Sequence, residues 1–171
     1  MRRSLPIVAF ILAIALASPA SAEEVADPDD VKGKLDLSLV VANKSDTDAP
    51  LRIRIETHEN WAASLLSWKG KNRVWILFNV DNDTNIEYVG TITSAKGKLG
   101  LNIEGSGSAF ETLRVSHPDG HTLKTKIPGD SPPNPEGTVR IAVRSRYKTK
   151  TGGCSEGCRD RAPNGGSLAV S

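Results

Sequence analysis

Acidic and amide side chains alternate along one short segment, and oxygens of this kind bind hard cations. They stand at every second position after an apolar run, at Asp81, Asp83, Asn85 and Glu87. The spacing suits a calcium loop, which needs about 6–8 oxygen ligands. Ile86 stands at the sixth position, where an EF-hand loop needs glycine, and the twelfth position lacks the glutamate that such a loop needs. A plain hairpin turn is the favoured alternative, because Asn and Asp are common turn residues.

Cys154 and Cys158 are the two cysteines of the chain. In an exported protein such a pair favours a disulfide, which here closes a loop of about five residues and contributes only ~2 kcal/mol of chain entropy. A zinc site with His117 and His121, which have the same spacing, is the less favoured alternative. The expected bridge therefore pins a turn in the tail and leaves the core independent of it.

Trp61, Trp68 and Trp75 are the three tryptophans. Trp75 lies in an apolar run and is expected in the core, and Trp61 is expected to pack a short helical turn onto a sheet. Trp68 has polar neighbours, so it is the candidate for stacking on a sugar ring. Single exposed apolar residues are also normal on protein surfaces.

Five arginines stand at positions of two predicted strands where the alternation places side chains on the outer face. They are Arg52, Arg54, Arg140, Arg144 and Arg146. If the two strands are neighbours, these side chains form a basic face that could meet an anionic wall polymer or a lipid surface. The alternative is a solvated face paired with acidic side chains, which the balanced charge of the chain favours.

Catalysis finds little support. His58 and Glu59 lie near Ser64, and Ser116 precedes His117, but neither group comes with the strained turn that presents a nucleophile. A triad is assembled in space, so an extracellular hydrolase stays open and no catalytic residue is assigned.

Alternating apolar and polar residues predict about eight short strands. They span residues 35–41, 51–56, 74–80, 86–93, 98–104, 111–117, 122–127 and 139–147. With one short helical turn near residues 60–66, they indicate an all-β protein, namely an antiparallel, jelly-roll-like β-sandwich, with an open barrel as the main competitor. The expected core comprises Leu35, Leu37, Leu39, Leu51, Ile53, Ile55, Ile76, Phe78, Val139, Ile141 and Val143.

The first residues predict export. Two arginines precede an apolar run at residues 6–17, and the small residues Ala20-Ser21-Ala22 end it. This is the layout of a signal peptide over residues 1–22, and its run is too short to span a bilayer. We therefore expect a secreted, extracellular protein.

The rest of the chain divides into three expected parts. Residues 23–32 are a flexible acidic lead-in, residues 33–148 the β-sandwich domain, and residues 149–171 a glycine-rich tail. Removing residues 1–22 takes away two arginines and no acid, which leaves 20 basic and 20 acidic residues. This balance argues against a nucleic-acid partner, and no later segment is long and apolar enough to span a membrane.

Four segments resemble small secreted proteins of high-GC Gram-positive (actinobacterial) bacteria. They are Asp-Pro-Asp-Asp-Val-Lys-Gly-Lys-Leu-Asp at 27–36, Trp61 with Leu65-Leu66, Phe78-Asn-Val-Asp-Asn-Asp83, and Cys154-x3-Cys158-x-Asp160-x-Ala162-Pro163-Asn164. The resemblance implies a β-sandwich domain and a C-terminal cysteine pair, and carries no known activity. Relatives of this kind often have glycine inside the acidic turn, which Thr84-Asn85-Ile86 lacks.

Together these observations favour a secreted, non-enzymatic binding or structural module. It would act at the cell surface or in the medium, with an extracellular polysaccharide or another surface component as its partner. No cofactor is expected apart from the calcium candidate. An extracellular hydrolase is the alternative.

Overall fold

The chain folds into one continuous antiparallel sheet. The computed structural model describes residues 22–105, 111–134, 137–150 and 153–171. The strand order is β1-β2-β3-β8-β7-β6-β5-β4-β9-β10, and β11 also pairs with β9. The all-β expectation is therefore confirmed.

The elements have the following bounds. The strands are β1 (Ala22–Ala26), β2 (Leu37–Asn43), β3 (Leu51–Thr57), β4 (Arg73–Asn79), β5 (Tyr88–Ala95), β6 (Lys98–Gly105), β7 (Glu111–Ser116), β8 (Thr122–Ile127), β9 (Val139–Tyr147), β10 (Cys158–Ala162) and β11 (Leu168–Val170). A short 3-10 helix, η1 (Ala63–Leu66), lies between β3 and β4 at the expected helical turn.

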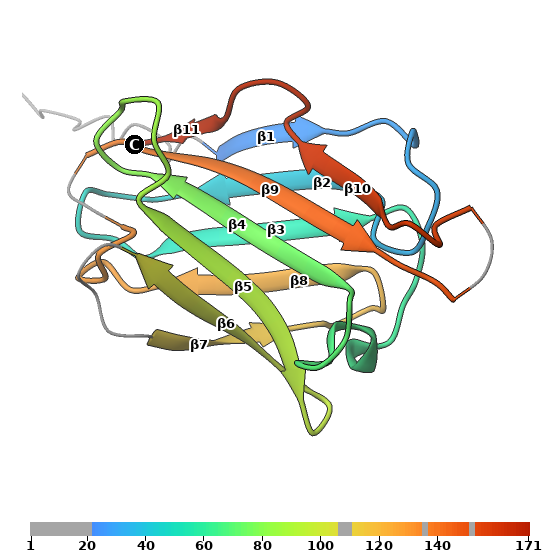
Figure 1. Ribbon diagram of the computed structural model, residues 1–171. Helices are drawn as coiled ribbons and strands as arrows, with labels where there is room; N and C mark the ends of the chain where they lie inside the picture. Colours follow the sequence, from blue (N-terminus) through green and yellow to red (C-terminus); the bar gives the residue numbers. More distant parts are fainter. Residues whose placement is uncertain (1–21, 106–110, 135–136, 151–152) are drawn as a thin grey trace, which may run out of the picture.

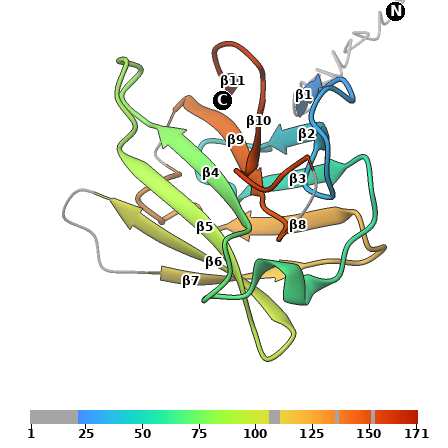
Figure 2. The same ribbon diagram turned by 45° about the vertical axis from the view of Figure 1, so that its right-hand side comes forward.

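The sheet curls until its two ends nearly meet. Figure 1 shows β4, β5 and β9 in front of β2, β3 and β8, and Figure 2 shows β1 and β2 near β10 and β11. Strands β10 and β11 contact β2, and β11 also contacts β1. No backbone ladder joins these two ends among the described residues, so the shape is a nearly closed barrel. We call the junction between β1–β2 and β10–β11 the seam.

Three strands go beyond the eight expected, and the sheet is not clearly a sandwich. All eight predicted strands are present, while β1, β10 and β11 are additional. The added strands have only 5, 5 and 3 residues, so any two-residue period in them is short and easily missed. Alternation also records which side chains face inward but not how the sheet closes, so the sequence could not separate a sandwich from a barrel.

The added strands lie in segments that the sequence suggested were outside the domain. β1 belongs to residues 23–32 apart from its first residue, and β10 and β11 belong to residues 149–171. Ala162 and Val170 are fully buried in the core. The lead-in and the tail thus form the two sides of the seam.

The side chains on the inward face of the sheet form the core, and one residue that was expected there is not part of it. Ten of the eleven predicted core residues are buried, but Leu39 is only half-buried. The pairing of β2 with β3 shifts register between Leu37 and Leu39. A bulge of this kind reverses the parity of the residues that follow, so Val40 and Ala42 face the core in place of Leu39.

Polar groups close the seam where the ladder stops. The Leu37 amide donates to the Asp160 carboxylate over 2.6 Å, and the Ser145 hydroxyl donates to the Leu35 carbonyl. Nearby, Gly33 has φ +122°, and an added Cβ there would lie 2.2 Å from the Tyr147 ring. This close approach explains why glycine precedes the first core leucine.

The expected signal peptide, residues 1–22, lies outside the described residues except for Ala22. Among the residues that are described, no helix has the length and apolar character needed to cross a membrane.

Candidate functional site

The acidic segment after β4 forms the turn between β4 and β5. Carboxylate oxygens of Asp81, Asp83 and Glu87 lie within 4.8 Å of one another, on side chains that are exposed or half-buried. The loop already uses these oxygens internally. The Asp83 amide donates to Asp81, the Asn85 amide donates to Asp83, and the Val80 amide donates to Glu87. The calcium role of this turn stays a prediction.

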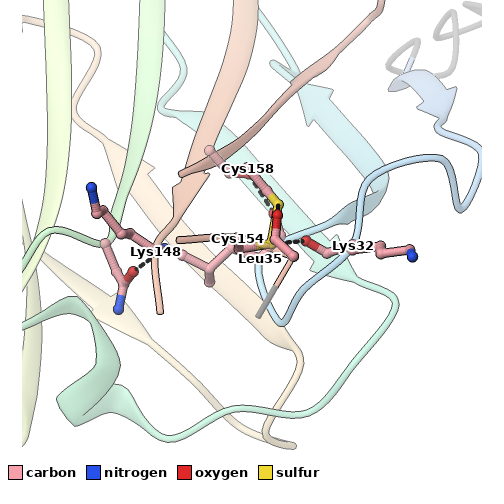
Figure 3. Close-up of a disulfide and its surroundings, with 8 residues drawn as sticks. Lys32, Leu35, Lys148, Cys154 and Cys158 are labelled. Atoms are coloured by element: carbon pink, nitrogen blue, oxygen red, sulfur yellow. Dashed lines mark hydrogen bonds between the residues drawn. A yellow bond between two sulfur atoms is a disulfide. The ribbon is translucent and has the colours of Figure 1, made fainter. Parts of the chain in front are cut away.

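Cys154 and Cys158 form a disulfide, as the sequence predicted. Their thiols are therefore not zinc ligands with His117 and His121. The bridge packs against the barrel: Cys154 is 5% exposed, and its Sγ lies 2.9 Å from the Lys32 carbonyl oxygen. This is a packing contact, because a disulfide sulfur carries no proton to donate. Figure 3 shows the bridge against the segment that contains Lys32 and Leu35.

This docking gives the disulfide more weight than its small loop suggests. Replacing Cys154 and Cys158 together by serine should cost at least the chain-entropy contribution of ~2 kcal/mol. At roughly 2–4 °C per kcal/mol for a chain of this size, the melting temperature should fall by about 4–8 °C or more. Thermal melts of the double variant and of dithiothreitol-treated wild type measure the effect. An unchanged melting temperature in both would mean that the docked turn adds nothing to stability.

The three tryptophans take different environments. Trp61 is buried, stacks on His117 with ring centroids 4.2 Å apart, and donates its indole N–H to the Thr57 hydroxyl. Trp68 is 64% exposed on the loop after η1. Trp75 corrects an expectation, because it is half-buried on the outer face of β4, opposite the core residues Val74 and Ile76.

Neither His58 nor His117 forms an ion pair with a carboxylate among the described residues, whereas the His121 ring lies 3.6 Å from the Asp119 carboxylate. Both ring nitrogens of His117 face carbonyl oxygens, those of Thr122 and Trp61, at 2.9 and 3.0 Å. The hollow that contains Ser116 and His117 has no carboxylate among its lining residues. His58 faces the Asp27 carbonyl at 3.2 Å.

The predicted basic face divides into two separate surfaces. Strand β3 pairs with β2 and β8, whereas β9 pairs with β4, β10 and β11, so the arginines of β3 and β9 are apart. The β3–β8 surface is a hollow whose cationic side chains are Arg52, Arg54, Arg114, Lys124 and Lys126. On it Arg54 pairs with Glu56 at 3.2 Å. Arg140 of β9 donates to Asn82 in the β4–β5 turn.

The second surface contains two rows of side chains across β4, β9 and β10. One row is Arg73, Arg146 and Arg159, and the other is Trp75, Arg144 and Arg161. Directly opposed cross-strand residues have Cβ atoms about 4.5–5.5 Å apart, and like charges there are destabilising. The fold therefore holds like charges together at an energetic cost.

These rows line a groove of about 600 Å³, which we call the arginine groove. Its apolar lining comes from Trp75, Leu77 and Val89, and its cationic lining from Arg144, Arg146, Arg159 and Arg161. A smaller adjoining hollow shares Trp75 and Arg146 and adds Lys71, Arg73 and Lys148.

The groove arginines lack ionic partners. None of the salt bridges of the described residues includes Arg144, Arg146, Arg159 or Arg161. The Nε atoms of Arg146 and Arg161 are buried without a hydrogen-bond acceptor, although Arg161 donates through Nη2 to the Gly166 carbonyl over 2.7 Å. Unpaired guanidinium groups beside an indole form a site for an anion that also has a flat apolar face.

A buried acidic cluster borders this groove. Asp27, Asp30, Asp36 and Asp160 each place a carboxylate oxygen within 4.8 Å of the others, and Asp30 and Asp160 also line the groove. Burial, reinforced by the negative charge of Asp160, raises the pKa of Asp27 to about 7. Burial also raises the pKa of Asp36 to about 7, with further contributions from Asp29 and Asp160. These are the carboxylates best placed to hold a hard cation.

The sequence analysis did not identify the residues that complete the arginine groove and the acidic cluster. Arg159, Asp160 and Arg161 lie in the segment expected to be a tail, and the strand expected at residues 35–41 makes Asp36 a polar position between two core leucines and gives it no further role. The alternation of Arg159, Asp160, Arg161 and Ala162 was the available signal, since it is the pattern of a strand with a basic outer face.

Comparisons with protein-family models, curated proteins and solved structures gave no match. The resemblance to small secreted actinobacterial proteins stays a prediction.

Proposed function

We propose that the protein is a secreted, non-enzymatic module that binds an acidic extracellular polysaccharide in the arginine groove. The observation that carries this proposal is the pair of rows across β4, β9 and β10, in which arginines without salt-bridge partners lie beside Trp75. The signal-peptide pattern of residues 1–22 and the disulfide support an extracellular location, because disulfides persist in oxidising compartments.

The chemistry of the groove matches a charged sugar. Guanidinium groups bind carboxylate or sulfate oxygens in a bidentate manner, and an indole offers an apolar face for a pyranose ring. Strands about 4.8 Å apart place neighbouring arginines within reach of one acidic sugar or of two adjacent ones. Trp68 lies on the loop whose carbonyl groups accept hydrogen bonds from Arg73, so it could extend the stacking surface.

The β3–β8 surface fits this ligand less well. It contains no aromatic side chain, and two of its five cations are lysines, which bind anions as hydrated point charges. Arg54 is already paired with Glu56. This surface supplies a matched control, because Arg52 and Lys126 are two exposed cations on neighbouring strands, as Arg144 and Arg159 are in the groove.

An extracellular hydrolase is the weaker candidate. The residues that such an enzyme would need, a histidine, a carboxylate and a serine in one hollow, do not come together around His117. A binding module needs only the rows of arginines that the groove already holds.

Affinity electrophoresis of the protein in gels containing polygalacturonate, dextran sulfate or neutral dextran tests the proposal. We expect retardation by the two acidic polymers and none by dextran, with weaker binding as the salt concentration rises. The Arg144→Ala/Arg159→Ala variant should lose about tenfold in affinity per arginine, or about 1.4 kcal/mol each. Its stability should stay unchanged or rise, because like charges are removed.

The control variant Arg52→Ala/Lys126→Ala should bind as the wild type does. Equal losses in both variants would mean general charge attraction and would contradict a groove-specific site. Binding to phosphatidylglycerol vesicles but to neither polysaccharide would assign the surface to lipid and overturn the proposal.

A further inference from the structure

The acidic cluster at the seam is the strongest unexplained feature outside the arginine groove. Asp27, Asp36 and Asp160 are only 5%, 3% and 7% exposed, and their carboxylate oxygens converge with that of Asp30. Aspartates are almost never fully buried unless they are paired or coordinate a metal. No cationic side chain forms a salt bridge with these four among the described residues.

Three buried carboxylate oxygens of the cluster lack a hydrogen-bond donor, although other oxygens of the cluster have one. Asp160 accepts from the amides of Leu37 and Arg161 at 2.6 and 2.5 Å, and one oxygen of Asp27 accepts from the Asn164 side chain at 3.0 Å. The other oxygen of Asp27 and both oxygens of Asp36 meet no donor.

Asp36 is therefore a nearly fully buried carboxylate with two oxygens that lack a hydrogen-bond partner, and one of them converges with the oxygens of the other three aspartates. Asp29 lies beside it, but a second carboxyl can satisfy the first only if one of the two holds a proton. Both oxygens of Asp36 thus lack a partner when the group is ionised, and a bound cation would supply one.

The separations fit a calcium ion. Calcium binds oxygen at about 2.3–2.6 Å, so two ligands on opposite sides of one ion are about 4.6–5.2 Å apart. The four oxygens lie within 4.8 Å of one another, and all can belong to one coordination sphere. The set contains no nitrogen or sulfur ligand, which argues against zinc. Asp30 is exposed, so it gives the ion and its remaining water ligands a path from solvent.

We propose that Asp27, Asp30, Asp36 and Asp160 form a calcium site that ties the two ends of the sheet together. Asp27 and Asp30 follow β1, Asp36 precedes β2, and Asp160 lies in β10. The ion thus bridges the N-terminal and C-terminal sides of the seam, where no backbone ladder joins them among the described residues. The unfolded chain has no such site, so calcium stabilises the fold by mass action.

The full chain gives a direct test. After removal of metal with a chelating resin, we expect one calcium ion per chain by calorimetric titration at neutral pH. Millimolar calcium should raise the melting temperature by several degrees, since a concentration 100 times the dissociation constant adds ~2.7 kcal/mol. Magnesium should act more weakly, because it demands near-ideal octahedral geometry.

The Asp36→Asn variant distinguishes a role of Asp36 as a calcium ligand from a role in the fold alone. It should abolish the calcium-induced rise in melting temperature, yet melt no lower than the wild type in metal-free buffer, because a buried unpaired charge is removed. Asp83→Asn, in the β4–β5 turn, is the matched control and should keep the full calcium response.

Other outcomes would overturn the proposal. The absence of calcium uptake and of any shift in melting temperature would do so, and so would a response lost in Asp83→Asn but kept in Asp36→Asn. Circular dichroism checks that each variant is folded. The readouts are calcium binding and stability without any polysaccharide, so failure here leaves the proposed function standing, and the reverse also holds.

Discussion

Replacing Val40 with aspartate is expected to unfold the protein or to lower its melting temperature by about 10 °C or more. Val40 is fully buried in the core, and a buried, uncompensated charge costs about 3–5 kcal/mol. Domains of ordinary stability have only about 5–15 kcal/mol in total. Urea unfolding followed by tryptophan fluorescence, together with thermal melts, measures the loss.

Leu39→Asp is the matched control, one residue earlier in β2. Leu39 is half-buried on the outer face, so the variant should fold and lose about 1 kcal/mol or less. The opposite result, with Leu39→Asp unfolded and Val40→Asp folded, would show that β2 follows the uninterrupted alternation that the sequence suggests. The pair therefore tests whether the bulge between Leu37 and Leu39 exists in solution.

Local alternation predicted the strands well because it records burial directly. Each of the eight predicted strands is present, and Leu51, Ile53 and Ile55 face the core as their spacing requires. The error at Leu39 has a physical origin, since a bulge inserts one residue and leaves every later side chain on the opposite face. Nothing in Leu37-Ser38-Leu39-Val40 marks that insertion.

The candidate sites were harder to predict because strand order decides them. Arg144 and Arg146 were recognised as outward-facing, but their partners are Arg159 and Arg161 of β10 rather than the arginines of β3. The acidic cluster likewise joins Asp36 to Asp160, which are more than a hundred residues apart in sequence. Contacts of that separation depend on how the sheet closes, and a two-residue period contains no information about closure.

Strand β10 connects the two proposed sites. Its inward side chain Asp160 belongs to the acidic cluster, while its outward side chains Arg159 and Arg161 line the arginine groove. A strand of five residues at the edge of a sheet is weakly held by its own ladder. The bonds at the seam and the nearby disulfide therefore also position the arginines of the groove.

The metal-free protein should lose stability as the pH rises from about 4 to about 7. The pKa values of Asp27 and Asp36 are raised to about 7 in the folded protein from 3.8, mainly by burial. Between these values the folded state binds more protons than the unfolded state, so stability falls as the pH rises. Negative charges on Asp29, Asp30 and Asp160 favour the protonated forms of the pair, and the charge of His58 opposes them.

Urea unfolding midpoints between pH 4 and pH 8, in buffer freed of metal by a chelating resin, measure this loss. Asp36→Asn removes one of the two titrating groups, so its profile should be flatter than that of the wild type across the same range. Asp83→Asn, whose parent carboxylate is exposed in the β4–β5 turn, should follow the wild type. A wild-type profile that is level or rises over this range, and that Asp36→Asn leaves unchanged, would mean that Asp27 and Asp36 are ionised in the folded protein without a cation. The buried cluster would then need another source of compensation, because carboxylates at this depth cannot share the seam as unpaired charges.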